Sequence, residues 1–176
     1  MADGRIRVLE RNLTDEILYG RPVDQVKVFV SAKMSDGSLA RERKTAIREI
    51  DGIPPHTAWA WEKSAAAGPY SALRICIANA RTSEMLVLIV ADEITAPTKK
   101  EYTAAKNRGV PRFIFMKQGV PRSADLTEFI EKERSKAITT VPFRNLPELR
   151  SQIRYSLHAY TTRLHRASLL NARTPR

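Results

Sequence analysis

The chain has 176 residues, a length typical of one domain, and 43% of them are hydrophobic, which excludes a wholly disordered chain. Its longest apolar run, residues 85–91, is far shorter than the ~20 residues that cross a bilayer. The first twelve residues lack the pattern of a secretory signal, and the single cysteine, Cys76, excludes an intramolecular disulfide framework and a multi-thiolate zinc site within one chain. We therefore expect a cytoplasmic protein that does not associate with membranes.

The formal net charge is +11, and it is concentrated toward the carboxyl end of the chain. From Arg112 onward there are thirteen basic and five acidic residues. Such a balance favours anionic partners, which include nucleotides, nucleic acid and acidic proteins. A solvated basic face on a terminal helix explains the same charge equally well.

Short β-branched runs alternate with segments of helical period along the whole chain. The pattern predicts five strands, at residues 26–31, 56–62, 84–91, 110–116 and 137–143. It predicts five helices as well, at residues 39–50, 70–82, 98–108, 125–135 and 147–165. A weaker helical pattern covers residues 8–19.

Strands that alternate with helices indicate a parallel sheet covered on both faces and joined by right-handed crossovers. We expect an α/β fold, a flavodoxin-like three-layer sandwich with a five-stranded parallel sheet of order 2-1-3-4-5. Residues 25–166 would form this single domain. An extension at residues 1–24 and a basic tail at residues 167–176 would flank it.

In open α/β sheets, ligands bind beyond the carboxyl ends of the strands, where the strand order reverses. Here that crevice lies between the strand that ends at Ser31 and the strand that ends at Ala91. The loops that meet there carry several polar groups and an unusual number of carboxylates for so basic a chain. The candidate residues are Ser31, Lys33, Ser35, Asp36, Trp61, Glu62, Asp92, Glu93, Thr98, Lys99 and Glu101.

Several short motifs carry a family resemblance. The segment Glu101-Tyr-Thr-Ala-Ala-Lys-Asn-Arg-Gly-Val-Pro111, with the strand that follows it, resembles the signature of nucleoside 2-deoxyribosyltransferases. Val28-Phe-Val-Ser-Ala32, Leu39-Ala-Arg-Glu-Arg43 and Trp61-Glu62 resemble more closely an uncharacterised bacterial domain family of signalling and defence proteins. Both groups are placed in a wider superfamily with TIR domains.

The resemblance implies attack on an N-glycosidic bond of a nucleoside, a nucleotide or NAD. By resemblance, Glu101 is the carboxylate that meets the developing oxocarbenium ion. Glu62 or Asp92 would serve as the second acid, which holds the ribose hydroxyls or protonates the leaving base. Lys33 and Lys99 would bind a phosphate. We expect no metal and no bound cofactor.

Two other classes of function remain open. One is a non-catalytic module that senses a nucleotide in the same crevice, or that assembles a protein partner or a homo-oligomer. The other is nucleic-acid binding by the arginines of residues 144–166, which rests on charge alone.

The individual residues also have plainer interpretations. An acid such as Glu101 in the first turn of a helix gains ~0.3–1 kcal/mol from the helix dipole without any catalytic role. Glu62 is equally an anchor for its loop, and Arg43 with Glu42 is typical of a structural ion pair. Trp59 and Trp61 are expected to pack on one side of a strand, and Cys76 is expected to be a small buried apolar group.

Overall fold

The computed structural model describes residues 25–136 and 138–173, with side chains to residue 170. Five strands form one sheet of order β2-β1-β3-β4-β5, and every pairing is parallel. The expected strand order and fold class are confirmed. The strands are β1 (Val26–Ala32), β2 (His56–Trp59), β3 (Met85–Val90), β4 (Arg112–Lys117) and β5 (Thr140–Phe143).

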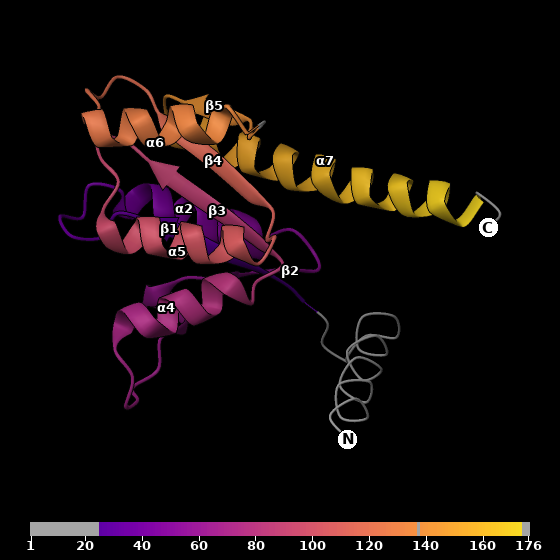
Figure 1. Cartoon of the computed structure of the whole chain (residues 1–176), viewed down its shortest axis with the longest axis horizontal. Helices are drawn as coiled ribbons and strands as arrows, with labels where there is room; N and C mark the ends of the chain where they lie inside the picture. Colours follow the sequence, from indigo (N-terminus) through magenta and orange to yellow (C-terminus); the bar gives the residue numbers. More distant parts are fainter. Residues whose placement is uncertain (1–24, 137, 174–176) are drawn as a thin grey trace.

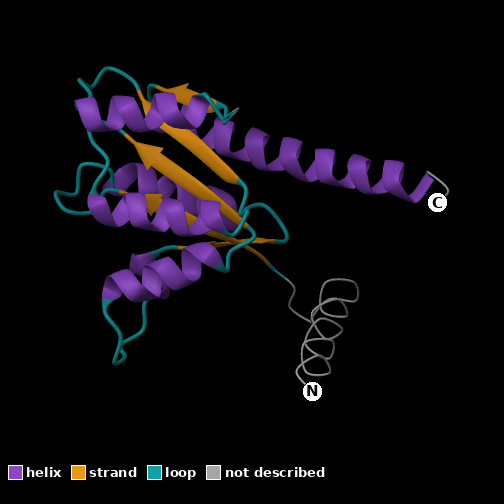
Figure 2. Cartoon of the chain, viewed as in Figure 1, coloured by secondary structure: helices purple, strands orange, loops and turns teal. Residues whose placement is uncertain are grey.

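Helices cover both faces of the sheet, as Figure 2 shows. One face is covered by helices α2 (Ala40–Asp51) and α7 (Leu146–Arg173), which pack against each other. The other face is covered by α4 (Ala72–Arg81), α5 (Ala96–Asn107) and α6 (Ala124–Arg134). The residues of β3 alternate between the two cores, and all six are buried. This is the pattern of a central parallel strand.

The segment after β2 differs from the expected strand at residues 56–62. The strand ends at Trp59, and Trp61–Ser64 forms the single-turn helix α3. The main-chain oxygen of Ala60 accepts hydrogen bonds from the amides of Lys63 and Ser64, which turns the chain out of the sheet. Trp59 stacks on Phe29 with ring centroids 5.0 Å apart, while Trp61 lies on α3 rather than beside it in a strand.

Two further boundaries differ from those expected. Strand β5 begins at Thr140 rather than at residue 137, and residue 137 lies outside the described residues. Helix α7 continues to Arg173, well beyond residue 165, because residues 166–173 contain no glycine or proline to end it. The residues expected to form a tail from 167 are therefore helical as far as 173. The helix expected at residues 8–19 lies outside the described residues.

The carboxyl-terminal part of α7 projects away from the sheet (Figure 1). Its first three turns are anchored in the core by Leu149, Ile153 and Leu157, all fully buried. Leu164, two turns further on, is 50% exposed. Among the described residues, no helix is both long enough and apolar enough to span a bilayer.

Two leucines of α7 provide a matched test of this packing. Replacing the fully buried Leu157 by alanine removes apolar contacts and leaves a cavity, so we expect Leu157→Ala to lower the free energy of unfolding by about 2–5 kcal/mol. Leu164→Ala, at a half-exposed position of the same helix, should lower it by about 1 kcal/mol or less, because only half of the side chain is removed from water. Urea denaturation followed by circular dichroism measures both. Equal losses would contradict this account of how α7 packs.

Candidate functional site

Glu101 lies on α5 and reaches across to the carboxyl end of β1. Its Oε2 accepts a hydrogen bond from Ser31 Oγ at 2.5 Å, and the Cys76 thiol of α4 hydrogen-bonds the same carboxylate. Helix α5 begins at Ala96, with Thr95 as its capping residue, so Glu101 lies in the second turn. The expected first-turn position is therefore wrong, and the helix dipole, which acts within the first turn, does not explain an acid here.

The surroundings of Glu101 disfavour its charge. Burial raises the pKa of the Glu101 carboxyl above its usual value. The hydrogen bonds from Ser31 and Cys76 and the positive charge of Arg43 oppose that rise without cancelling it. Burial, followed by the neighbouring carboxylate, raises the pKa of the Cys76 thiol to about 12. Cys76 is therefore a neutral hydrogen-bond donor to Glu101 and, as expected, a buried residue.

Arg43 links Glu101 to a second carboxylate. It lies on α2, is only 5% exposed, and its guanidinium forms an ion pair with Glu62 of α3. Its charge also acts on Glu101, so one guanidinium influences both carboxylates. The Arg43 Nε atom is buried and has no acceptor among the described residues. We call Ser31, Arg43, Glu62, Cys76 and Glu101, which come from five different elements, the Glu101 cluster.

A second group of charges surrounds Lys33, directly after β1. Lys33 Nζ lies 2.6 Å from Asp36, 3.2 Å from Asp92 and 2.7 Å from Glu93. The lysine side chain is buried, whereas the three carboxylates are partly exposed. The loop after β1 and the loop after β3 are thereby joined by one ammonium group, at the place where the strand order reverses.

We call Lys33, Asp36, Asp92 and Glu93 the Lys33 cluster. The pKa values of three of its members shift in the directions that ion pairing predicts. Hydrogen bonds that the ammonium group donates to Asp36 and Glu93 hold the pKa of Lys33 well above its usual value. The pKa of Asp36 lies far below its usual range, chiefly because of Lys33. Burial acts to raise the pKa of Asp92, but main-chain hydrogen bonds and Lys33 outweigh it, so that this pKa is lowered too. Asp36 and Asp92 are therefore ionised at neutral pH.

The remaining candidate residues lie apart from these clusters. Ser35 is exposed in the loop between β1 and α2, and Trp61 packs against the core beneath α4 and α5. Thr98 is buried, and its hydroxyl hydrogen-bonds that of Thr95. Lys99 forms an ion pair with Asp125 of α6, so it lies with α6 and not with Lys33.

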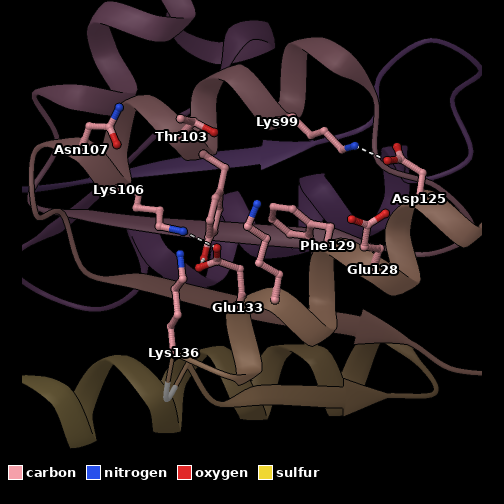
Figure 3. Close-up of a pocket in the computed structure, with 11 residues that line it drawn as sticks. Lys99, Thr103, Lys106, Asn107, Asp125, Glu128, Phe129, Glu133 and Lys136 are labelled. Atoms are coloured by element: carbon pink, nitrogen blue, oxygen red, sulfur yellow. Dashed lines mark hydrogen bonds and ion pairs between the residues drawn. The ribbon is translucent and has the colours of Figure 1, made fainter.

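A polar cavity of about 380 Å³ lies between α5 and α6 (Figure 3). Lys106 pairs there with Glu133, which is 2% exposed and also accepts a hydrogen bond from the Tyr102 hydroxyl at 2.8 Å. Lys136 faces the same pair, and its pKa is lowered chiefly by the ammonium group of Lys106. The basic end of this cavity lies at the carboxyl ends of α5 and α6, where helix dipoles favour cations and oppose a bound anion.

The sequence identifies some residues of the Glu101 cluster as site residues and misses others. It predicts only a packing role for Cys76, and for Arg43 only an ion pair with its neighbour Glu42. Glu42 instead pairs with Lys117 of β4, at 2.7 Å. No local pattern marks these contacts, because Arg43 and Glu62 are separated by a complete strand. Two of the α7 arginines that were candidates for nucleic-acid binding form ion pairs within the protein, since Arg150 and Arg154 both pair with Glu49.

Together, the strand order and the loops that meet at the carboxyl edge define a flavodoxin-like α/β protein with its candidate site at the switch point. The chain belongs to the family described as domain of unknown function DUF4062, whose model matches residues 27–158. No curated protein sequence matches the chain.

Solved structures resemble the chain in fold only. A conserved protein from Enterococcus faecalis V583 is 14% identical, with a TM-score of 0.51, and the match covers 76% of this chain and 99% of that one. A flavodoxin from the domain Archaea is 9% identical, with a TM-score of 0.46 and coverage of 73% and 94%. The metal-soaked Flv1 flavodiiron core from Synechocystis sp. PCC6803 is 12% identical, with a TM-score of 0.48; the match covers 88% of this chain but 41% of that longer chain.

The Lys33 cluster gives a prediction that depends on pH. Replacing Lys33 by methionine leaves Asp36, Asp92 and Glu93 close together with no cation between them. We expect Lys33→Met to lower Tm at pH 7 and to lower it less at pH 4, because the carboxylates of the variant take up protons there and their repulsion falls.

Thermal unfolding at the two pH values measures this effect. Lys100→Met, which removes an exposed lysine of α5, is the matched control and should change Tm little at either pH. A loss of Tm that is equal at pH 7 and pH 4 would mean that Lys33 stabilises the loops by packing rather than by charge.

Proposed function

We propose that this protein is an N-glycosidase that acts on a nucleoside, a nucleotide or NAD, with Glu101 as the carboxylate at the reacting carbon. One observation carries the proposal: Glu101 is a partly exposed carboxylate at the carboxyl edge of the sheet that forms no ion pair with a described residue. The neighbouring acids Glu62 and Asp92 are both paired with cations. The resemblance of residues 101–116 to nucleoside 2-deoxyribosyltransferases supports the same assignment.

The proposed reaction has two steps, transfer of the sugar to the carboxylate and hydrolysis of the resulting ester. The Glu101 carboxylate attacks the anomeric carbon of the sugar, the bond from that carbon to the base nitrogen breaks, and the base leaves with the electron pair. A nucleoside base takes up a proton as it leaves, whereas the nicotinamide of NAD leaves neutral without one. Water then attacks the glycosyl ester, which releases the free sugar, restores the carboxylate and returns a proton to the solvent. A carboxylate held in position can also stabilise the oxocarbenium ion without a covalent bond.

The other residues of the Glu101 cluster position and tune this carboxylate. The Ser31 hydroxyl donates to one Glu101 oxygen and fixes the orientation of the side chain. The buried Arg43 Nε, which has no acceptor among the described residues, would donate to a hydroxyl or phosphate oxygen of the substrate. Glu62, 41% exposed and held by Arg43, is the acid available to the ribose hydroxyls.

One observation favours a second function, that of a nucleotide-binding module without turnover. Glu62 and Asp92, the two candidates for the second acid, are each held by a cation, so neither is poised to protonate a leaving base. Binding of a nucleotide with no release of base would assign the protein to this class.

The catalytic assignment is tested by following base release from NAD and from a panel of nucleosides and nucleotides by chromatography. If Glu101 is the catalytic carboxylate, Glu101→Gln keeps the shape of the side chain but removes its charge, and we expect the rate to fall by roughly 10²–10⁴-fold. Glu128→Gln, at an exposed acid of α6, is the matched control and should keep the rate of the unaltered protein. Release that is unchanged in Glu101→Gln would clear Glu101 of the role.

The same variant has an expected effect on stability. Because burial raises the pKa of Glu101 in the folded state, its ionised form is unfavourable there at pH 7, and folding is favoured as the group takes up a proton at lower pH. Glutamine can still accept the hydrogen bond from Ser31. We therefore expect Glu101→Gln to unfold at an equal or higher Tm than the unaltered protein at pH 7, with the difference shrinking toward pH 4.

Thermal unfolding at both pH values measures this effect, independently of any substrate. A clear fall in Tm at pH 7 would show that Glu101 is a stabilising ion-pair partner. That result would remove the structural argument for a functional carboxylate at this position.

A further inference from the structure

A groove on the opposite side of the sheet from Glu101 has the features of a peptide-binding surface. It encloses about 500 Å³ between α7 and the edge of the sheet formed by β4 and β5. Phe113 and Tyr160 line it, with ring centroids 5.5 Å apart in an edge-to-face arrangement. Tyr155, 74% exposed, stands at its rim. We call this the edge groove.

The edge groove contains an acceptor that lacks a donor. The Gln152 side chain donates from Nε2 to the main-chain oxygen of Pro142 at 2.7 Å, and because that oxygen only accepts, the assignment of the two amide atoms is fixed. Its Oε1 atom is therefore the free end of the amide, and it is buried with no partner among the described residues. A buried acceptor without a donor is costly, so an occupant that offers an N–H group to Oε1 once the amide turns toward the groove would be favoured here.

The groove also presents an uncompensated positive charge. Arg163 lines it and forms no ion pair with a described residue, in contrast to Arg150 and Arg154 of the same helix, which pair with Glu49. Gln152 and Arg163 are eleven residues apart, which is three turns, so they lie on one side of α7 roughly 16 Å apart along its axis. An extended chain of about five residues covers that length.

We propose that the edge groove binds an extended acidic peptide segment of a partner protein. An apolar side chain of the peptide would lie against Phe113 and Tyr160, a main-chain N–H would donate to Gln152 Oε1, and a carboxylate would pair with Arg163. A nucleic acid fits less well, because the groove is largely apolar and offers one arginine rather than a stripe of cations. This surface does not depend on the function proposed for Glu101.

The test begins with a phage-displayed library of random heptapeptides selected on the full chain. We expect enrichment of peptides that combine an acidic residue with apolar neighbours. The enriched peptide is then synthesised with a fluorescent label, and its Kd is measured by fluorescence polarisation. Arg163→Gln should weaken binding by roughly five- to tenfold and Tyr155→Ala by at least about threefold. Both side chains are exposed, so neither variant should affect folding.

Two controls make the test specific. Arg166→Gln removes an exposed arginine of α7 that does not line the groove, and it should leave Kd unchanged. N-methylation of the peptide should weaken binding at the one position whose N–H meets Gln152, and this loss should disappear in Gln152→Met. Failure to enrich acidic peptides, binding that is insensitive to Arg163→Gln and Tyr155→Ala, or displacement of the peptide by a short oligothymidylate would each overturn the proposal.

Discussion

The complete burial of β3 between β1 and β4 is the constraint on which the rest of the structure depends. All six of its side chains are apolar and buried, three toward each layer of helices, so the strand fits only at the centre of a sheet covered on both faces. Parallel pairing then brings the carboxyl ends of β1 and β3 to the same edge. The chain leaves β1 toward one layer and β3 toward the other, which opens a position between their loops for polar side chains.

Charge at that edge is divided between two clusters with different character. Lys33 gathers three partly exposed carboxylates and joins the two loops, an arrangement that stabilises the rim of the sheet. In the Glu101 cluster the pairing is incomplete, because Arg43 pairs with Glu62 and reaches Glu101 only through its field. Among the described residues, the carboxylate of Glu101 has no ion-pair partner and the Arg43 Nε has no acceptor, which is why we propose the chemistry there.

The fold could be predicted from the sequence because alternating apolar runs and helical periods are local properties, and five such units leave few topologies. Boundaries set by main-chain hydrogen bonds are harder to predict: the end of β2 depends on two amides that donate to the carbonyl of Ala60, and no side-chain pattern indicates it. The partner of Lys99 could not be predicted for a related reason. A lysine in the first turn of a helix reaches several loops, and only the position of Asp125 on α6 determines which one it meets. The interactions among Glu101, Cys76 and Arg43 join different elements, and the spacing of residues along the sequence does not predict interactions of that kind.

The position of Glu101 is informative because local forces do not favour an acid there. It lies beyond the first turn of α5, so the helix dipole does not stabilise it, and it has no cation within ion-pairing distance among the described residues. Burial opposes its charge, and the hydrogen bonds from Ser31 and Cys76 offset only part of that cost. An acid kept where its charge is unfavourable, in the field of an arginine whose buried Nε lacks an acceptor among the described residues, is an arrangement that costs the free protein stability. Such a cost is what we expect at the ligand site that we propose. The same reasoning separates this site from the Lys33 cluster, where every carboxylate is satisfied by the protein itself and a ligand would have to displace an existing bond.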